Sequence, residues 1–311
     1  MKPIAPLKIL FTWNPPRGLD QIAACLPDLE VHATEDRAEI LRLIPEAEVA
    51  CVGYFDAEIF QAAKKLRWVQ AFSGGVNGLL FPEFVASPIP MTCLKGCFGT
   101  AAAEHALAVM LAYATRLEYD IRQRPQRAFT ITDPFELGGK TVGIVGLGDM
   151  GLEIARKCRA FEMRVIGLAR RPRPCPDGVD QILPLPALLA ASDFVVVTVP
   201  LTPETKGLIG EAQLRAMKPG AYLVDISGRP AVYDLTALER ALRERWIAGA
   251  NLQLVPAADS PLWGLENLLL SFHRVVSGEQ YDQCVEAFCE NLRLYRAGKP
   301  LLGLVDKPAG Y

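Results

Sequence analysis

The chain has 311 residues, a formal net charge of -2, half of its residues hydrophobic and 22% charged. This length allows two domains, each with its own core, and the composition predicts a folded chain without disordered parts. Because the basic residues occur in short local groups, the charge argues against a general nucleic-acid-binding protein.

The sequence shows no signal for a membrane or for secretion. The first ten residues lack the apolar segment of about 7 to 15 residues that a signal peptide needs, and no apolar span of about 18 residues occurs elsewhere. We therefore expect a cytoplasmic protein with no membrane partner. The eight cysteines follow no framework spacing and are expected to be reduced core residues. With three histidines in the chain, and Cys93 and Cys97 far from other ligands, no metal site is expected.

The first hundred residues alternate short apolar runs with segments of helical period. Strands are expected at 8–12, 49–53 and 67–72, and helices at 19–26, 37–43 and 57–65. This order predicts a small parallel α/β domain.

A long helix is expected over residues 99–122. It is apolar on nearly all sides from Ala101 to Ala114, which predicts a buried helix that packs between domains or subunits. A second α/β alternation follows, with strands at 141–145, 164–168, 194–199, 222–226, 248–254 and 268–272, and helices at 152–161, 214–217, 235–245 and 282–297. The tail 301–311 is expected to return to the first domain.

The strand at 141–145 ends in a G-x-G-x-x-G sequence formed by Gly146, Gly148 and Gly151. Gly146 permits a tight turn, Gly148 lets backbone approach a pyrophosphate, and Gly151 allows the helix to pack closely on the strand. The N-terminus of the following helix favours phosphate. Strand, turn, helix and second strand occur in the order of a dinucleotide-binding unit, so this stretch predicts a nicotinamide or similar dinucleotide cofactor.

The end of the second strand predicts which dinucleotide. A carboxylate that would bind the ribose 2′-hydroxyl of NAD is expected about 20 residues into the unit. That place holds Ala169, followed by Arg170, Arg171 and, after a proline, Arg173. Guanidinium groups bind a 2′-phosphate in bidentate fashion, so we expect NADP to be preferred over NAD.

Another glycine-rich loop, Ser73, Gly74, Gly75 and Val76, follows the strand at 67–72. Its backbone N–H groups could hold a substrate carboxylate, or it could be a plain turn; the spacing alone leaves both open.

These features together resemble the D-isomer-specific 2-hydroxyacid dehydrogenase family. The markers are Gly74-Gly75-Val76, Ala103-Glu-His-Ala106, the turn at 146–151, Val199-Pro-Leu-Thr-Pro-Glu-Thr205, Lys218-Pro-Gly-Ala221, Ser260-Pro-Leu-Trp263 and the ending 304–311. The resemblance implies two Rossmann-like α/β domains: a nucleotide-binding domain, 100–282, inserted into a discontinuous flavodoxin-like substrate domain, 1–99 and 283–311. It also implies a homodimer whose long helix near residue 100 forms part of the interface. Implied cofactor-binding residues are Asp149, Met150, Val199, Pro200, Thr205 and Ile226, besides the glycines and Ala169, Arg170 and Arg171.

The family's catalytic set is an arginine that binds the substrate carboxylate, a histidine that passes the proton and a glutamate that orients the histidine. His273 occupies the histidine position. Counting forward from Gly220 places Gly228 at the arginine position, whereas counting back from Asp234 places Arg229 there. A one-residue insertion reconciles the counts and makes Arg229 the candidate.

The glutamate position has no counterpart. The stretch from Gln253 to Asp259 contains no carboxylate before Asp259, which we expect to face solvent. Gln253 can hydrogen-bond a nicotinamide carboxamide, since its amide both donates and accepts. Without the glutamate the His273 imidazolium is less stabilised, and general acid catalysis, typically worth about 10²–10⁴-fold, should weaken.

Three functions remain compatible with the sequence. The favoured one is an NADP(H)-dependent reductase of small 2-oxo acids to D-2-hydroxy acids. The second is a divergent oxidoreductase that acts on an uncharged carbonyl, for which a carboxylate-binding arginine is unnecessary. The third is an NADP(H)-binding sensor protein that has lost the chemistry.

Overall fold

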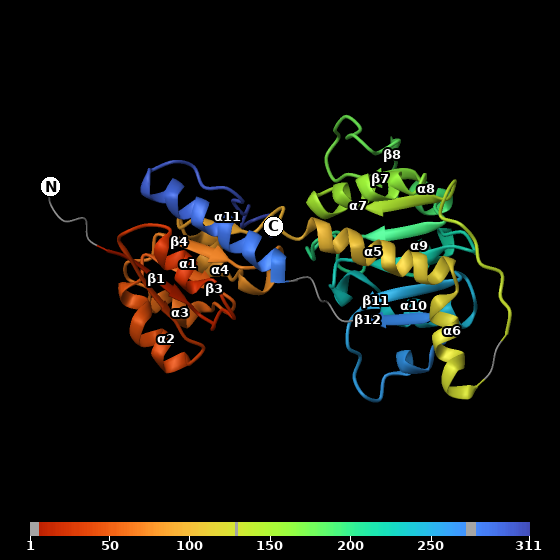
Figure 1. Cartoon of the computed structure of the whole chain (residues 1–311), viewed down its shortest axis with the longest axis horizontal. Helices are drawn as coiled ribbons and strands as arrows, with labels where there is room; N and C mark the ends of the chain where they lie inside the picture. The colour runs from red at the N-terminus through yellow and green to blue at the C-terminus, as the bar shows by residue number, and fades with distance from the viewer. Residues whose placement is uncertain (1–5, 128–129, 272–277) are drawn as a thin grey trace. The chain divides into compact units, whose positions relative to one another are not determined.

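The computed structural model describes residues 6–127, 130–271 and 278–311. The chain divides into two compact units (Figure 1): Met1–Phe98 with Val276–Tyr311, here called unit 1, and Gly99–Val275, called unit 2. Unit 1 is therefore built from two segments of the chain, and unit 2 is inserted between them. The predicted His273 lies outside the described residues.

Unit 1 is a parallel sheet in the order β2-β1-β3-β4-β5, which is the flavodoxin-like order. Its strands are β1 (Leu7–Phe11), β2 (Leu29–Ala33), β3 (Val49–Val52), β4 (Trp68–Ala71) and β5 (Met91–Cys93). Its helices are α1 (Leu19–Ala24), α2 (Arg37–Leu43), α3 (Ala57–Ala62), α4 (Pro82–Ala86) and α11 (Gly278–Arg296).

Both faces of the unit 1 sheet are covered. Leu7, Ile9 and Phe11 of β1 pack with Ile22 of α1 and with α11 residues such as Phe288. Leu10 faces the opposite way, into a second cluster with residues of α2, α3 and α4. Burial of such a side chain contributes about 1.5–3 kcal/mol, and this two-sided burial explains why the strands are apolar without alternation.

The expectations missed the edges of this sheet. β2 and β5 were not predicted, and neither was α4. β2 is half-exposed and its sequence, LEVHA, mixes charge with apolar residues, while β5 has three residues. Short edge strands have little of the apolar run by which buried strands are recognised.

Unit 2 is a second parallel sheet, in the order β12-β11-β10-β9-β6-β7-β8. The order reverses between β6 and β9, as in the Rossmann fold. The strands are β6 (Thr141–Val145), β7 (Arg164–Leu168), β8 (Gln181–Ile182), β9 (Phe194–Val197), β10 (Tyr222–Asp225), β11 (Gly249–Gln253) and β12 (Leu268–Ser271). The helices are α5 (Gly99–Ala114), α6 (Leu117–Gln123), α7 (Asp149–Ala160), α8 (Leu185–Ala191), α9 (Glu211–Ala216) and α10 (Leu235–Arg243).

Successive residues of β9 show how the unit 2 core is divided. Phe194 and Val196 pack in a cluster with α5 and α7, which lie side by side (Figure 1). Val195 and Val197 face the other cluster, formed with α8, α9 and α10. The sheet is thus the middle of three layers, which places functional groups at its edges and in its loops.

The single helix expected over 99–122 is wrong, because the structure has two helices there. Arg116 adopts a left-handed conformation (φ 64°) between α5 and α6. Its guanidinium lies over the rings of Tyr113 and Phe135 and donates from Nε to the carbonyl of Asp133 (3.1 Å). These contacts hold the break, which the apolar pattern of the sequence does not reveal.

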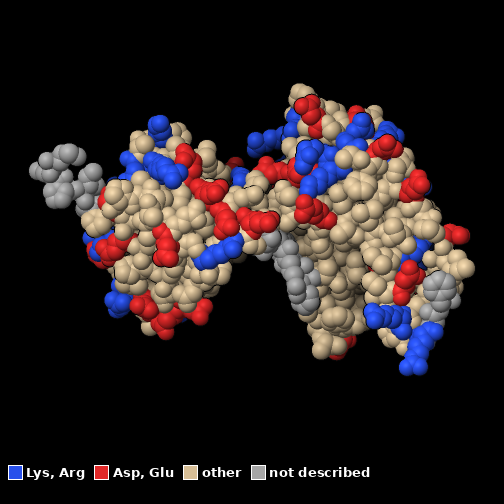
Figure 2. Space-filling model, viewed as in Figure 1, with Lys and Arg blue, Asp and Glu red and all other residues tan. Residues whose placement is uncertain are grey.

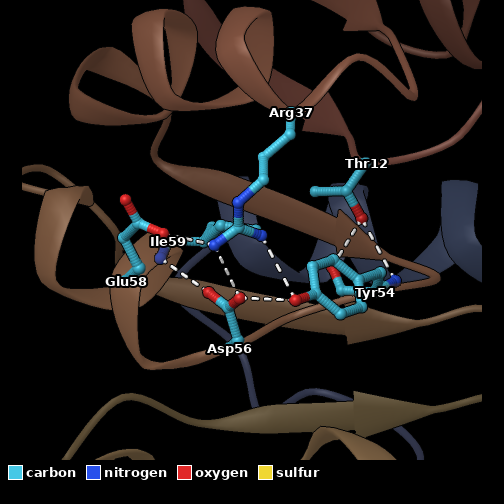
Figure 3. A network of polar contacts seen from close by, with 6 residues as sticks. All are labelled: Thr12, Arg37, Tyr54, Asp56, Glu58 and Ile59. Atoms are coloured by element: carbon cyan, nitrogen blue, oxygen red, sulfur yellow. Dashed lines mark hydrogen bonds and ion pairs between the residues drawn. The ribbon is translucent and has the colours of Figure 1, made fainter.

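Charges of both signs are interspersed over the face of each unit shown in Figure 2. Some form local networks, such as the one around Arg37 in unit 1 (Figure 3), where Arg37 pairs with Asp56 (2.9 Å) and Glu58, and the Tyr54 hydroxyl donates to Asp56 (2.5 Å). One guanidinium thus serves two carboxylates, and the network keeps one net negative charge. Across the described ranges, no helix has the length and apolar character needed to cross a membrane.

Candidate functional site

One edge of the unit 2 sheet gathers most of the predicted site. Because all its strands are parallel, the carboxyl ends of β6, β9, β10, β11 and β12 lie at the same edge. The glycine turn at 146–151, the loop at 198–205 and the loop at 226–229 follow β6, β9 and β10, and Gln253 and Ser271 are the last residues of β11 and β12. Ligands of open α/β sheets bind at this edge, near the point where the strand order reverses.

The glycine turn has the geometry that its glycines require. Gly146 has φ 111°, a conformation that favours glycine, and its carbonyl accepts a hydrogen bond from the Thr198 hydroxyl (2.6 Å). A Cβ on Gly151 would lie 2.1 Å from the Gly146 oxygen, so α7 packs against the turn at a distance that no larger residue permits.

Gly148 leaves room at the start of α7. A Cβ added there would meet no atom within 4 Å, and both Gly148 and Asp149 are exposed. Met150 is half-buried and packs on the core. The first N–H groups of a helix have no partner within that helix, and the macrodipole adds positive potential there. Open space beside such N–H groups suits a pyrophosphate.

The basic loop after β7 lies next to this turn. Ala169 packs at the margin of the core, whereas Arg170 and Arg171 are exposed. Arg173 donates from Nη1 to the carbonyl of Leu147, inside the turn (3.3 Å). Glu204 belongs to the loop at 198–205, and hydrogen bonds within that loop lower its pKa. The positive charge of Arg170 lowers it further. The loop can therefore present guanidinium groups beside the start of α7.

The loop from Val199 to Thr205 is held by its own hydroxyls. The Thr205 hydroxyl donates to the Pro200 carbonyl (2.6 Å) and accepts from the Thr202 N–H (2.7 Å). Val199 lies beside the turn, since a Cβ on Gly146 would be 3.1 Å from its side chain. A cofactor contact from Val199, Pro200 or Thr205 stays a prediction.

Asp225, the last residue of β10, was not predicted as a site residue. It is 1% exposed. Its Oδ1 accepts from the Ser227 hydroxyl (2.7 Å), the Gly228 N–H (3.2 Å) and the Tyr233 hydroxyl (2.8 Å), and its Oδ2 accepts from the Gln253 N–H (3.1 Å). A carboxylate at the end of an apolar strand was the signal that could have revealed it, because buried charges need dedicated partners.

Arg229 lies in the loop that Asp225 holds. It is half-buried, and its N–H donates to the Ser227 hydroxyl (3.2 Å). Gly228 has φ 57°, which favours glycine, and a short turn over Pro230–Val232 follows. Ile226 is buried, and its N–H donates to the Val197 carbonyl (3.0 Å). The assignment of Arg229 to the arginine position stays a prediction.

His105 of α5 approaches the same edge. Its Nε2 lies 3.3 Å from the Ser271 hydroxyl, which also accepts from the Asn251 amide (3.0 Å). Burial lowers the pKa of His105, and the Asp225 carboxylate opposes that shift. Ser271 is the last described residue before 278, and His273 follows it by two positions in the sequence.

The other predicted residues lie elsewhere. Ser73 to Val76 follow β4 in unit 1, where the Ser73 hydroxyl donates to the Gly75 carbonyl (2.8 Å), Gly74 is exposed and Val76 is buried. Asp259 is exposed, as expected. The Ser73 hydroxyl thus closes the loop at 73–76 on itself, and a role of this loop in substrate binding stays a prediction.

Gly151 and Gly148 should respond oppositely to alanine. Gly151→Ala forces a methyl against the Gly146 carbonyl and should destabilise unit 2 by about 3 kcal/mol, or roughly 6–12 °C in its melting temperature. Gly148→Ala points into open space and should leave the melting temperature nearly unchanged. Calorimetry of both variants tests this pair, and equal melting temperatures would contradict the packing described.

Comparisons with known proteins agree with this architecture. Residues 107–274 match the family described as D-isomer specific 2-hydroxyacid dehydrogenase, NAD binding domain. A glyoxylate reductase of Korarchaeum cryptofilum is 37% identical over 267 residues, covering 81% of this chain and 80% of the relative. A glyoxylate reductase of Thermococcus onnurineus is 35% identical, with coverage of 99% and 97%.

A solved structure shows the same fold over the whole length. The D-isomer specific 2-hydroxyacid dehydrogenase of Xanthobacter autotrophicus Py2, in complex with NADPH and MES, has a TM-score of 0.85 and 28% identity, and the alignment covers 99% of this chain and 100% of that one. The matched family covers just over half of the chain and includes the glycine turn and the sheet edge. The chain therefore belongs to the D-isomer-specific 2-hydroxyacid dehydrogenase family and is an NAD(P)-dependent enzyme of that family.

Proposed function

We propose that this protein reduces a small 2-oxo acid to a D-2-hydroxy acid with NADP(H), and that His273 donates the proton. The main support is the common sheet edge, where the glycine turn, the Arg229 loop and Gln253 lie at the carboxyl ends of β6, β10 and β11. The relatives named glyoxylate reductase support a small 2-oxo acid as substrate.

The residues divide the reaction between them. When bound, the dinucleotide supplies a hydride to the carbonyl carbon of the substrate. Arg229 binds the substrate carboxylate, His273 protonates the carbonyl oxygen, and the Gln253 side chain hydrogen-bonds the nicotinamide carboxamide. The backbone of Ser73 to Val76 is a second candidate for binding a carboxylate. Because the family glutamate has no counterpart, we expect slow turnover, short by part of the 10²–10⁴-fold that general acid catalysis typically gives.

The cofactor fits the residues at this edge. The open position at Gly148 and the start of α7 suit a pyrophosphate. The position after β7 holds Ala169 and exposed arginines in place of a carboxylate, which supports NADP over NAD. The similar structure from Xanthobacter autotrophicus was solved with NADPH, which supports a nicotinamide dinucleotide as the cofactor.

A homodimer is the assembly that we propose, with the helices near residue 100 at its interface. In support, Leu117 and Ile121, which are four residues apart on α6, expose 52% and 62% of their surface. Exposed apolar side chains on one helix face support an interaction site there.

Turnover on a panel of carbonyl compounds tests the function. With glyoxylate, hydroxypyruvate, pyruvate, phenylpyruvate and plain aldehydes and ketones, NADPH oxidation should occur with 2-oxo acids and fall at least about 100-fold in His273→Ala. Arg229→Ala should raise KM for the acid severely, because the carboxylate loses its guanidinium partner. Turnover only on uncharged carbonyls would favour the divergent oxidoreductase, and tight NADPH binding without turnover would favour the sensor.

Cofactor preference can be read from fluorescence titration. NADPH should bind at least about tenfold tighter than NADH, since each charge-assisted hydrogen bond to the 2′-phosphate contributes about 1.5–3 kcal/mol. The double change Arg170→Ala with Arg171→Ala should weaken NADPH and leave NADH unaffected, while Arg243→Ala, on the exposed face of α10, should change neither. Equal affinities of the natural protein for the two dinucleotides would refute this assignment of Arg170 and Arg171.

Light scattering tests the dimer. The natural chain should have the mass of two copies, and Ile121→Glu should shift it toward one copy because a charge is then buried in the interface. Leu302→Glu, an exposed position in unit 1, serves as the control and should remain dimeric. A single-copy mass for the natural chain would rule the dimer out.

A further inference from the structure

Asp225 stands out among the buried charged groups because it joins two elements to which the proposed function gives different tasks. Its Oδ1 holds the loop that ends at Arg229, and its Oδ2 holds the backbone of Gln253 on the neighbouring strand β11. The residue itself ends β10, which pairs with β11 in parallel. A single carboxylate thus spans from one strand end to the next.

The link to Arg229 runs through two successive hydrogen bonds. The Ser227 hydroxyl donates to Asp225 (2.7 Å) and accepts from the Arg229 N–H (3.2 Å). On the far side of the loop, the Tyr233 hydroxyl donates to the same Oδ1 (2.8 Å). Burial and the Asp225 charge raise the pKa of Tyr233, so this hydroxyl keeps its proton and remains a donor. The Arg229 loop is therefore tied to Asp225 before and after Arg229.

This arrangement suits the irregular loop of this chain. Pro230 follows Arg229 and has no backbone N–H with which to hold the chain at this point. Charge-assisted hydrogen bonds are roughly twice as strong as neutral ones, and a buried carboxylate with its acceptor sites filled fixes its donors in one geometry.

We propose that Asp225 is a positioning residue that sets the Arg229 loop and Gln253 in register, so that the substrate carboxylate and the nicotinamide carboxamide are held side by side. The inference rests on the proposed function for the tasks of Arg229 and Gln253. Asp225 itself contacts neither substrate nor cofactor in this proposal; it acts through the two residues that do.

Asp225→Asn is a demanding test because it preserves shape. An amide has one oxygen that accepts and one NH2 that donates. Hydroxyls of Ser227 and Tyr233 can turn to accept, but the N–H groups of Gly228 and Gln253 cannot. In either orientation of the amide, one backbone N–H faces an NH2 group and loses its acceptor, so either the Arg229 loop or Gln253 is released.

The matched control is Asp193→Asn. Asp193 precedes β9 at the opposite edge of the same sheet, where it accepts from the Thr141 N–H (2.8 Å) and the Lys218 ammonium (2.8 Å). It is therefore a similar backbone-binding carboxylate without a role at the site. Ser227→Ala is a narrower variant that cuts the link to Arg229 and leaves the bond to Gln253.

Two affinities separate positioning from general damage: that of NADPH and that of 2′-phospho-ADP-ribose, which is the same molecule without nicotinamide. In Asp225→Asn, either the affinity for NADPH should fall by about tenfold or KM for the 2-oxo acid should rise by about tenfold. The affinity for 2′-phospho-ADP-ribose should stay within about twofold of that of the natural protein. Ser227→Ala should raise KM and leave both affinities unchanged. Asp193→Asn should change none of the three.

Unchanged NADPH affinity together with unchanged KM in Asp225→Asn would overturn the proposal, as would equal losses of NADPH and fragment binding, which indicate a structural role. If Asp225→Asn fails to fold, Ser227→Ala decides, and an unchanged KM there overturns the proposal. Failure of the proposed function is recognised separately: the natural protein would reduce no 2-oxo acid. The affinities of Asp225→Asn for NADPH and for 2′-phospho-ADP-ribose would then still test the link between Asp225 and Gln253. A fall in both affinities, or in neither, would reject that link.

Discussion

The parallel register of the unit 2 sheet is the constraint on which the site depends. Parallel pairing from β12 to β6 brings the carboxyl ends of five strands to one edge, and each end continues into a residue or loop with polar groups to offer. Hydrophobic packing on both faces fixes this register, because a slip by one residue would turn Phe194 and Val196 away from α5 and α7. The core therefore sets the positions of the groups at the edge.

In the proposed function, backbone N–H groups at that edge bind phosphate, and a buried carboxylate aligns two neighbouring elements. The turn from Gly146 to Gly151 is packed so closely that its glycines cannot be replaced freely, and it leaves open space where α7 begins. Further along the edge, Asp225 collects the donors of two neighbouring elements. Such a carboxylate is strongly destabilising if its partners are removed, so it is well suited to hold a loop in one conformation.

Much of this arrangement could be predicted from sequence, and the exceptions have physical reasons. The glycine turn and the central strands follow from apolar runs and local spacing, which depend on neighbouring residues alone. The break at Arg116 depends on the Phe135 ring and the Asp133 carbonyl, which are distant from Arg116 along the chain. Helical periodicity reflects only neighbouring residues and therefore did not reveal the break. Asp225 was missed because its partners Tyr233 and Gln253 meet it only after the sheet has formed. The family resemblance supplied His273 and Arg229, and the structure adds what surrounds Arg229.

The central claim is that this sheet edge binds NADP(H) for the reduction of a 2-oxo acid. A crystal structure of the protein with NADPH tests it most directly. We predict the pyrophosphate against the N–H groups at the start of α7, the 2′-phosphate beside Arg170 or Arg171, and the nicotinamide carboxamide within hydrogen-bonding distance of Gln253. A dinucleotide bound away from this edge, or with its nicotinamide remote from Gln253 and the Arg229 loop, would contradict the account.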